Sequence, residues 1–318
     1  MNTEIDTLCE SWSVTTFRPK VWSCSEKSVL ASEVPLAVVM QGPLKKEDAF
    51  TEETLRLYRA TFPGAQLILS TWENEDSAAL RRIEELGVTV IKNSLPKNPG
   101  PYHVNYQIKS TVAGLEEAKR LGVSFAMKTR TDNRYCASNA GDYLYGLWKS
   151  FPVQDGVSRK GRLLILDLVT RLYVPHHAAD IMMFGHIDDM HSYWSLPPSN
   201  AQKPLNGMRV LGDLREDYVP EVYLCENYLK LCNQPCDRTL ENWWRVLADF
   251  YLVVDRSTLG FFWPKHSYGT EHSQTTNDEV RNLALCSMRD WFNIALFDKQ
   301  CPMEFEDIAD QPLHELLS

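Results

Sequence analysis

The chain has 318 residues, of which 44% are hydrophobic, and its formal net charge is −9 at pH 7. This length and apolar content exclude a disordered chain and suit one large α/β domain or two small ones. The excess of acidic residues excludes a general nucleic-acid binder, because neutralising phosphate groups takes a surplus of Lys and Arg.

Cysteine usage and the lengths of the apolar runs suggest where the protein works. The eight cysteines are scattered from Cys9 to Cys301, and the first residues lack the form of a secretory signal. No apolar run approaches the ~20 residues that span a bilayer. We therefore expect a cytoplasmic protein with reduced thiols, either soluble or peripheral to a membrane.

The first half of the chain alternates predicted strands and helices. Residues 1–34 show no period and are expected to form an N-terminal arm or irregular first layer, ahead of a single domain at 35–318. Continuous apolar runs predict buried strands, and amphipathic patterns that stop at Gly or Pro predict helices. In chain order these elements are strand 34–40, helix 51–62, strand 65–72, helix 78–86 and strand 88–91. This order is typical of a parallel, doubly wound half-sheet.

The same patterns continue further along the chain. The later predicted elements are helix 104–121, strands 125–130, 163–168 and 180–185, and helices 221–231 and 240–252. Together they predict the α/β class, with a Rossmann-like, mixed but mainly parallel central sheet flanked by helices.

Polar residues gather where the predicted strands end. These groups are Gln41-Gly42-Pro43, Ser70-Thr71-Trp72-Glu73, Asn93 and Arg130-Thr131-Asp132-Asn133-Arg134. Because the carboxyl ends of parallel strands face one crevice, we expect these side chains to converge on a ligand. The loop after the first strand has neither the spacing of a dinucleotide-binding loop nor the Lys of a P-loop.

Asp132 is the most informative of these residues. A carboxylate at the end of a buried strand can hold a divalent cation that bridges a diphosphate. Asn133 and Arg134 follow it where a second acid would strengthen a metal site. The alternative is that Asp132 caps the next turn or pairs with Arg130 or Arg134.

Three further positions carry candidate chemistry. His176, His177 and Asp180 lie at the mouth of a predicted strand and could bind acceptor hydroxyls or supply a base, although single histidines are more often structural. Glu221 opens a predicted helix whose dipole favours the ionised carboxylate, so it is a candidate base or simply a good N-terminal helix residue. His266 follows an aromatic loop and could complete a metal or phosphate site.

Taken in order, several short segments resemble the WavE family of lipopolysaccharide-biosynthesis proteins, which looks like a distant branch of the GT-A glycosyltransferases. The matching segments are 38–44, 69–73, 105–111, 128–132, 180–185 and 220–221. The resemblance implies a GT-A-like fold and transfer of a sugar from a nucleotide-sugar donor to a lipopolysaccharide, capsule or other surface glycan precursor. It also implies a glycan or glycolipid acceptor, and so peripheral contact with the inner face of the membrane.

Position at the predicted strand and helix ends, taken together with the resemblance, suggests roles for individual residues. The donor would contact Gln41, Gly42, Pro43, Thr71, Glu73, Asn105, Gln107, Lys109, Lys128, Arg130, Thr131, Asp132 and Arg134. Asp132 stands in the place of the GT-A metal motif and would bind Mg²⁺ or Mn²⁺, with His266 as a candidate second ligand. Because Asn133 and Arg134 stand where a second acid is usual, the alternative is a metal-free site in which Arg134 and the other cations of this set balance the diphosphate charge. Glu221 or Asp180 would take the proton from the acceptor hydroxyl.

Two other functions stay open. The single acid in the metal motif also suits a catalytically inactive sugar-binding or scaffold protein of a polysaccharide assembly system. A nucleotidyltransferase shares a related half-sheet, but the glycine-rich, lysine-bearing loop expected after its first strand is absent from residues 41–46.

Overall fold

The computed structural model describes residues 34–154, 157–203, 208–264, 284–297 and 300–313. Of the predicted arm at residues 1–34, only the last residue falls within this part of the chain. A seven-stranded sheet runs through the molecule in the order β3-β2-β1-β4-β7-β6-β8. Its strands are β1 (Leu36–Gln41), β2 (Gln66–Trp72), β3 (Thr89–Asn93), β4 (Phe125–Arg130), β6 (Leu163–Leu166), β7 (Met183–His186) and β8 (Tyr251–Val254).

The direction of the strands follows from how they are connected. β3, β2, β1 and β4 are mutually parallel, because a helix returns the chain to the same edge between each pair. β7 is antiparallel to both β4 and β6, and β6 is parallel to β8. The predicted α/β class with a mixed, mainly parallel, GT-A-like sheet is confirmed.

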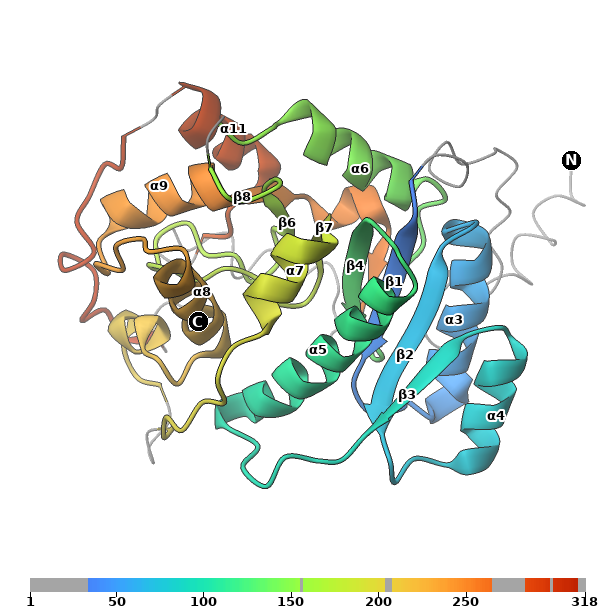
Figure 1. The fold of residues 1–318 in the computed structure, drawn as a ribbon. Coiled ribbons are helices and arrows are strands. Elements are labelled where there is room, and N and C mark those ends of the chain that lie inside the picture. The colour runs from blue at the N-terminus through green and yellow to red at the C-terminus, as the bar shows by residue number, and fades with distance from the viewer. Residues whose placement is uncertain (1–33, 155–156, 204–207, 265–283, 298–299, 314–318) are drawn as a thin grey trace, which may run out of the picture.

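Helices cover both faces of this sheet. The described α-helices are α3 (Phe50–Thr61), α4 (Ser77–Glu85), α5 (Val104–Arg120), α6 (Ala140–Ser150), α7 (Ile187–Trp194), α8 (Pro220–Leu231), α9 (Leu240–Phe250) and α11 (Met288–Phe297). Short 3-10 helices are η1 (Glu47–Ala49), η2 (Pro101–His103), η3 (Leu211–Arg215) and η4 (Arg256–Leu259). Figure 1 shows α3 and α4 on one side of β1 to β3 and α5 on the other. None of the helices in the described ranges has the length and apolar character needed to cross a membrane.

Three details differ from the sequence prediction. The helix predicted at 240–252 ends at Phe250, and the next four residues form β8, because Tyr251–Val254 are all fully buried beside β6. Helices α6 and α11 were not predicted. A small antiparallel pair, β5 (Arg134–Tyr135) and β9 (Phe261–Phe262), also joins the end of the fourth strand to a distant segment.

Candidate functional site

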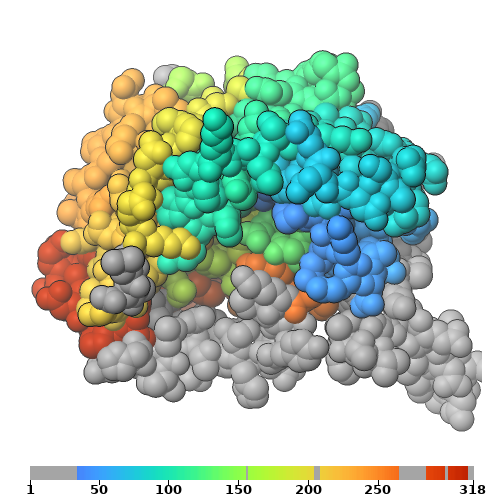
Figure 2. All heavy atoms as spheres, turned by 90° about the horizontal axis from the view of Figure 1, so that it is seen from below, coloured from blue at the N-terminus to red at the C-terminus, as the bar shows by residue number. Residues whose placement is uncertain are grey.

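A cavity of about 580 Å³ opens at the carboxyl ends of the parallel strands. Seen from below, this face of the molecule is hollowed between the blue and teal segments (Figure 2). The described residues that line the cavity are Gln41, Gly42, Pro43, Leu44, Lys45, Trp72, Leu95, Tyr102, His103, Tyr106, Gln107, Arg130, Thr131 and Asp132. The loops after β1 and β4 therefore meet here, as their strand-end positions predicted.

The loop after β1 depends on Gly42. Its φ of 119° is unfavourable for any side chain, and a Cβ there would lie 2.9 Å from Thr131 Oγ1. The backbone N–H of Gly42 donates to the Ser70 carbonyl at 3.1 Å, and the N–H of Thr131 donates to the Gln41 carbonyl at 3.1 Å. Only glycine lets the ends of β1, β2 and β4 approach this closely.

Glu75 and Thr51, two residues outside the predicted site, also hold the loop after β1. The Leu44 N–H donates to Glu75 Oε1 at 2.9 Å. The Lys45 N–H donates to Thr51 Oγ1 at 2.8 Å, and that hydroxyl donates to the Thr131 carbonyl at 3.1 Å. The Lys45 side chain, which lines the cavity, pairs with Glu47. The loop thus brings a cation to the cavity edge.

Hydrogen bonds from Arg130, the last residue of β4, hold the Asp132 carboxylate. Arg130 donates from Nε to Oδ1 and from Nη2 to Oδ2, each at 2.9 Å, and Trp263 Nε1 donates to Oδ2 at 3.2 Å. The Arg130 guanidinium also lies 5.4 Å from the centre of the Trp263 ring. Although burial opposes it, the hydrogen bonds and charge of Arg130 lower the pKa of Asp132, so the carboxylate is ionised. The ion pair predicted as the structural alternative is present.

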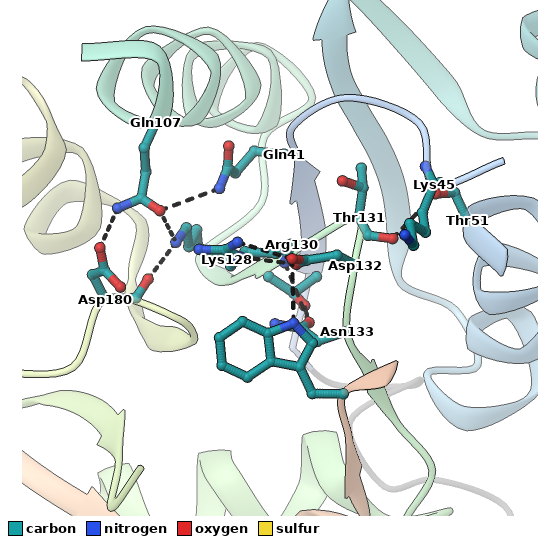
Figure 3. Close-up of polar contacts among 12 residues, drawn as sticks. Gln41, Lys45, Thr51, Gln107, Lys128, Arg130, Thr131, Asp132, Asn133 and Asp180 are labelled. Carbon is teal, nitrogen blue, oxygen red and sulfur yellow. Dashed lines mark hydrogen bonds and ion pairs between the residues drawn. The ribbon is translucent and has the colours of Figure 1, made fainter. Parts of the chain in front are cut away.

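The floor of the cavity is a buried hydrogen-bond network centred on Gln107 (Figure 3). Gln107 Oε1 accepts from Lys128 Nζ at 3.3 Å and from Gln41 Nε2 at 3.4 Å. Gln107 Nε2 donates to Asp180 Oδ2, and Lys128 Nζ donates to the Asp180 carbonyl. Gln41 is fixed in turn by Ser110, whose hydroxyl donates to Gln41 Oε1 at 2.8 Å. Asp180 and Lys128 are therefore joined to the cavity through Gln107.

Glu221 belongs to the same electrostatic neighbourhood. It is half-buried in the first turn of α8, and burial followed by the Asp180 carboxylate raises its pKa well above the ordinary value. Burial and the Asp180 charge therefore outweigh the stabilisation of the Glu221 anion that was expected from the helix dipole. Although burial is the larger effect on both, the Glu221 charge raises the pKa of Lys128 and of Tyr102. Glu221 itself is not among the described lining residues of the cavity.

The sequence analysis missed an aromatic wall. Trp72, Tyr102, His103 and Tyr106 line one side of the cavity. His103 and Tyr106 are stacked with ring centres 5.5 Å apart, and Tyr106 meets Trp72 edge to face at 5.4 Å. Tyr102 and His103 adopt the left-handed backbone conformation, with φ of 49° and 63°, which is unusual for such residues and concentrates at ligand sites. The sequence signal for this wall was the loop at residues 96–101, which is rich in Pro and Gly and comes just before the predicted helix 104–121.

Besides Lys128, five predicted donor residues lie outside the described lining of the cavity. Thr71 is fully buried within β2, and Glu73 is exposed in the turn after it. Asn105 is buried and joins two loops, accepting from the Ser199 N–H at 2.7 Å and donating to the Asn98 carbonyl at 3.1 Å. Lys109 is exposed and lines a second cavity of about 400 Å³.

Arg134 is the fifth of these residues, and its side chain points away from the cavity. The side chain is 1% exposed and points into α3, donating from Nε to Thr54 Oγ1 at 2.9 Å and from Nη2 to the Phe50 carbonyl at 3.3 Å. It lies over the Phe50 ring at 4.5 Å. Its charge is used to anchor β5 to α3.

His176 and His177, which were predicted to bind the acceptor, have both rings buried and bonded within the protein. His176 is 0% exposed and lies 3.2 Å from Glu226 Oε1 and 3.0 Å from Asn242 Oδ1. His177 Nδ1 bonds the Val169 carbonyl at 2.8 Å, and burial lowers its pKa to about 3. Both are structural residues of the segment before β7. His266 lies outside the described residues.

The family assignment comes from the sequence. A model of the family described as WavE lipopolysaccharide synthesis matches residues 36–302. No curated protein matches the chain.

Several solved structures share parts of the architecture. Glucosyl-3-phosphoglycerate synthase from Mycobacterium tuberculosis, in complex with Mn²⁺, uridine diphosphate and phosphoglyceric acid, has a TM-score of 0.42 and 12% identity over 85% of this chain and 86% of that one. A cytidylyltransferase from Leptospira borgpetersenii has a TM-score of 0.37 and 13% identity over 84% and 95%. Similarities this slight carry no argument about function. The family match, which covers most of the chain, shows that this protein belongs to the WavE lipopolysaccharide synthesis family.

Proposed function

We propose that this protein is a glycosyltransferase that moves a sugar from a nucleotide-sugar donor to a lipopolysaccharide or other surface glycan precursor. The observation that carries the proposal is the cavity at the strand ends. It combines an aromatic wall, a cation and a carboxylate within about 580 Å³, a size that suits a nucleotide sugar. Membership of the WavE family supports the choice of acceptor class.

The donor's parts match the two sides of the cavity. A nucleobase has an apolar face that stacks on aromatic rings, and Tyr102, His103 and Tyr106 offer such faces. A diphosphate needs cations, which Arg130 and Lys45 supply. In this arrangement the base lies against α5 and the diphosphate lies over the ends of β1 and β4.

A divalent cation is compatible with this arrangement. Mg²⁺ in such sites is held by one or two carboxylates, with water and substrate phosphates completing its shell. Asp132 is the acid that lines the described part of the cavity, and it would hold the ion once the diphosphate draws Arg130 away. Within the described residues no three His, Cys, Asp or Glu side chains gather as a preformed metal site. A bound ion would balance charge on the leaving nucleotide.

Transfer requires a group that takes the acceptor proton. The acceptor oxygen forms a bond to the anomeric carbon, the bond from that carbon to the phosphate oxygen breaks, and the nucleoside diphosphate leaves with both electrons. We assign the acceptor proton to Glu221, with Asp180 as its partner. Burial and the Asp180 charge raise the pKa of Glu221 toward neutrality and above, the range in which a general base works well.

Two measurements test the proposal. Thermal stabilisation of the purified protein by a panel of UDP-, GDP-, CMP- and dTDP-sugars, with and without Mn²⁺, identifies the donor, because a ligand that binds only the native state raises Tm. Release of the nucleotide, a nucleoside diphosphate or, from a CMP-sugar, CMP, in the presence of truncated lipopolysaccharide then reports transfer. We expect one donor to give both signals.

The same panel separates the rival functions. Stabilisation by a nucleotide sugar without transfer to any glycan acceptor would indicate a binding or scaffold protein. Consumption of a nucleoside triphosphate with release of pyrophosphate would indicate a nucleotidyltransferase. Absence of any shift would overturn the proposed donor site.

A further inference from the structure

Lys128 occupies an unusual place for a cation of a phosphate-binding motif. It lies within β4, its side chain is 0% exposed, and it is not among the described residues that line the cavity. Its amine donates to the Asp180 carbonyl and to Gln107 Oε1, and it lies 4.6 Å from the centre of the Trp194 ring. Two of these contacts are with Asp180 and Trp194, which are not among the described lining residues of the cavity, and the third is with Gln107, which lies between the amine and the cavity-lining side chain of Gln41.

These contacts fix which way the Gln107 amide points. Its oxygen faces two donors, the Lys128 amine and the Gln41 amide nitrogen, while its nitrogen faces the Asp180 carboxylate. In the flipped orientation the Gln107 nitrogen would face two other donors, and its oxygen would face the Asp180 carboxylate, so neither atom would have a hydrogen-bond partner. In a buried site that mismatch is costly, because each group would lose its partner. One orientation of Gln107 is therefore strongly preferred.

The charges around Lys128 belong to the proposed reaction. Asp180, Arg130, Asp132 and Glu221 all act on the Lys128 amine. Burial lowers the pKa of Lys128 to about 7, and the Asp180 carboxylate partly opposes this effect. The amine is thus close to its own titration at neutral pH and, when protonated, favours the ionised form of Glu221.

We propose that Lys128 is a positioning residue of the transferase site, which orients Gln107 and holds Asp180 beside Glu221, and that it does not bind the donor diphosphate. The inference rests on the proposed function and deepens it. It replaces the role that the sequence motif predicted for this lysine. It also explains why this fully buried strand position holds a lysine, although burying an apolar residue there would cost less free energy.

The test compares Lys128→Met with wild type and with Lys119→Met, a matched control in which an exposed α5 lysine is changed. In Lys128→Met we expect the nucleotide Kd to stay within about twofold while kcat falls by at least about tenfold. The acid limb of the pH profile of kcat should move to higher pH, because the carboxylates lose a neighbouring positive charge. Lys119→Met should match wild type in all three respects.

Two results would overturn the inference. A tenfold or larger rise in nucleotide Kd with unchanged kcat would make Lys128 a phosphate ligand, and wild-type values throughout would make it a bystander. If Lys128→Met fails to fold, Lys128→Gln keeps a hydrogen-bond donor at this position and the same comparison applies. Partial recovery of kcat in Lys128→Gln relative to Lys128→Met is expected when both fold.

Failure of the proposed function can be told apart from failure of this inference. If the wild-type protein transfers no sugar, the proposed function is lost, and the inference is then decided by the side-chain amide NMR signals of Gln107. These signals should shift in Lys128→Met and not in Lys119→Met. Unchanged Gln107 signals would show that Lys128 does not position this amide.

Discussion

Arg130 and Asp132, two residues apart at the end of β4, make two parallel hydrogen bonds of 2.9 Å each. This pair fills both carboxylate oxygens of the one acid that lines the described part of the cavity. A ligand that brings its own negative charge competes with Asp132 for Arg130, so diphosphate binding and release of Asp132 are expected to be linked.

Replacement of Asp132 tests that linkage. Asp132→Asn is nearly isosteric but cannot hold a divalent cation as well, and we expect transfer to fall by about 100-fold or more while Tm changes little. The measurement is nucleoside diphosphate release with and without Mn²⁺. Glu73→Gln serves as the control, since Glu73 is exposed outside the cavity and should keep the wild-type rate. Wild-type transfer by Asp132→Asn would remove Asp132 from the mechanism.

The aromatic wall predicts how the protein holds its nucleotide. Tyr102→Leu should weaken nucleotide binding by roughly tenfold, about 1.4 kcal/mol, because a stacking face is lost. Tyr102→Phe keeps the ring and the same left-handed backbone position, so it should bind within about twofold of wild type. Isothermal titration with the donor identified by the Tm panel measures both. Equal weakening in the two variants would point to the hydroxyl instead of the ring.

Gly42 should tolerate no side chain. Gly42→Ala forces a Cβ to within 2.9 Å of Thr131 Oγ1 at a φ of 119°, so we expect a loss of stability of roughly 1–3 kcal/mol and weaker nucleotide binding. Gly146→Ala is the matched control, since it lies within α6 with open space around its Cβ and should stabilise the helix by about 0.5–1 kcal/mol. Urea unfolding of the two variants should therefore give changes of opposite sign.

Glu221 predicts a dependence of stability on pH. In the unfolded chain this carboxyl loses its proton near 4.5, whereas the folded protein keeps the proton to higher pH. Its contribution to stability is therefore fully present below pH 4.5 and is lost as pH rises through the raised folded pKa.

The side chain in Glu221→Gln is neutral at every pH, so this variant should not lose stability in this way as pH rises. Its Tm relative to wild type should increase steadily from pH 4.5 to pH values above the folded pKa. The exposed Glu85→Gln is a suitable control and should show no such trend. A constant Tm difference between Glu221→Gln and wild type would contradict the raised pKa.

His176 should matter for stability and not for the acceptor. Although burial opposes it, the hydrogen bonds from His176 and Arg238 lower the pKa of Glu226 to about 2, so His176 helps to hold a buried carboxylate. His176→Ala should destabilise the protein by about 3 kcal/mol, because it breaks a buried charged network. The acceptor KM, measured below the lowered Tm, should be unchanged. A raised acceptor KM at normal stability would restore the role predicted from the sequence.

Much of the fold could be predicted from local pattern. The continuous apolar runs of β1, β2 and β4 have strand length and are bounded by turn residues, and each strand was predicted to within two residues at either end. One cavity is lined by Gln41, Gly42, Pro43, Arg130, Thr131 and Asp132, because the carboxyl ends of adjacent parallel strands must meet at one edge. Their contact with a donor stays a prediction.

Other features depended on contacts that no local pattern encodes. Arg134 and Lys128 have the charge of phosphate ligands, yet one points into α3 and the other lies beneath Gln107. The start of β8 right after α9 depends on pairing with β6, which is more than eighty residues away in the sequence.

The sequence by itself determined the α/β class, the order of the first strands and the edge at which polar groups gather, because burial period and turn chemistry are local properties. Only the tertiary structure decided which of those groups face the cavity. It buried His176 and Arg134, brought Tyr102 and His103 to the wall in a left-handed turn, and joined Asp180 to Gln107. The physical reason is that side-chain direction and desolvation depend on neighbours distant in the chain, whereas residue type alone fixes only what chemistry is possible.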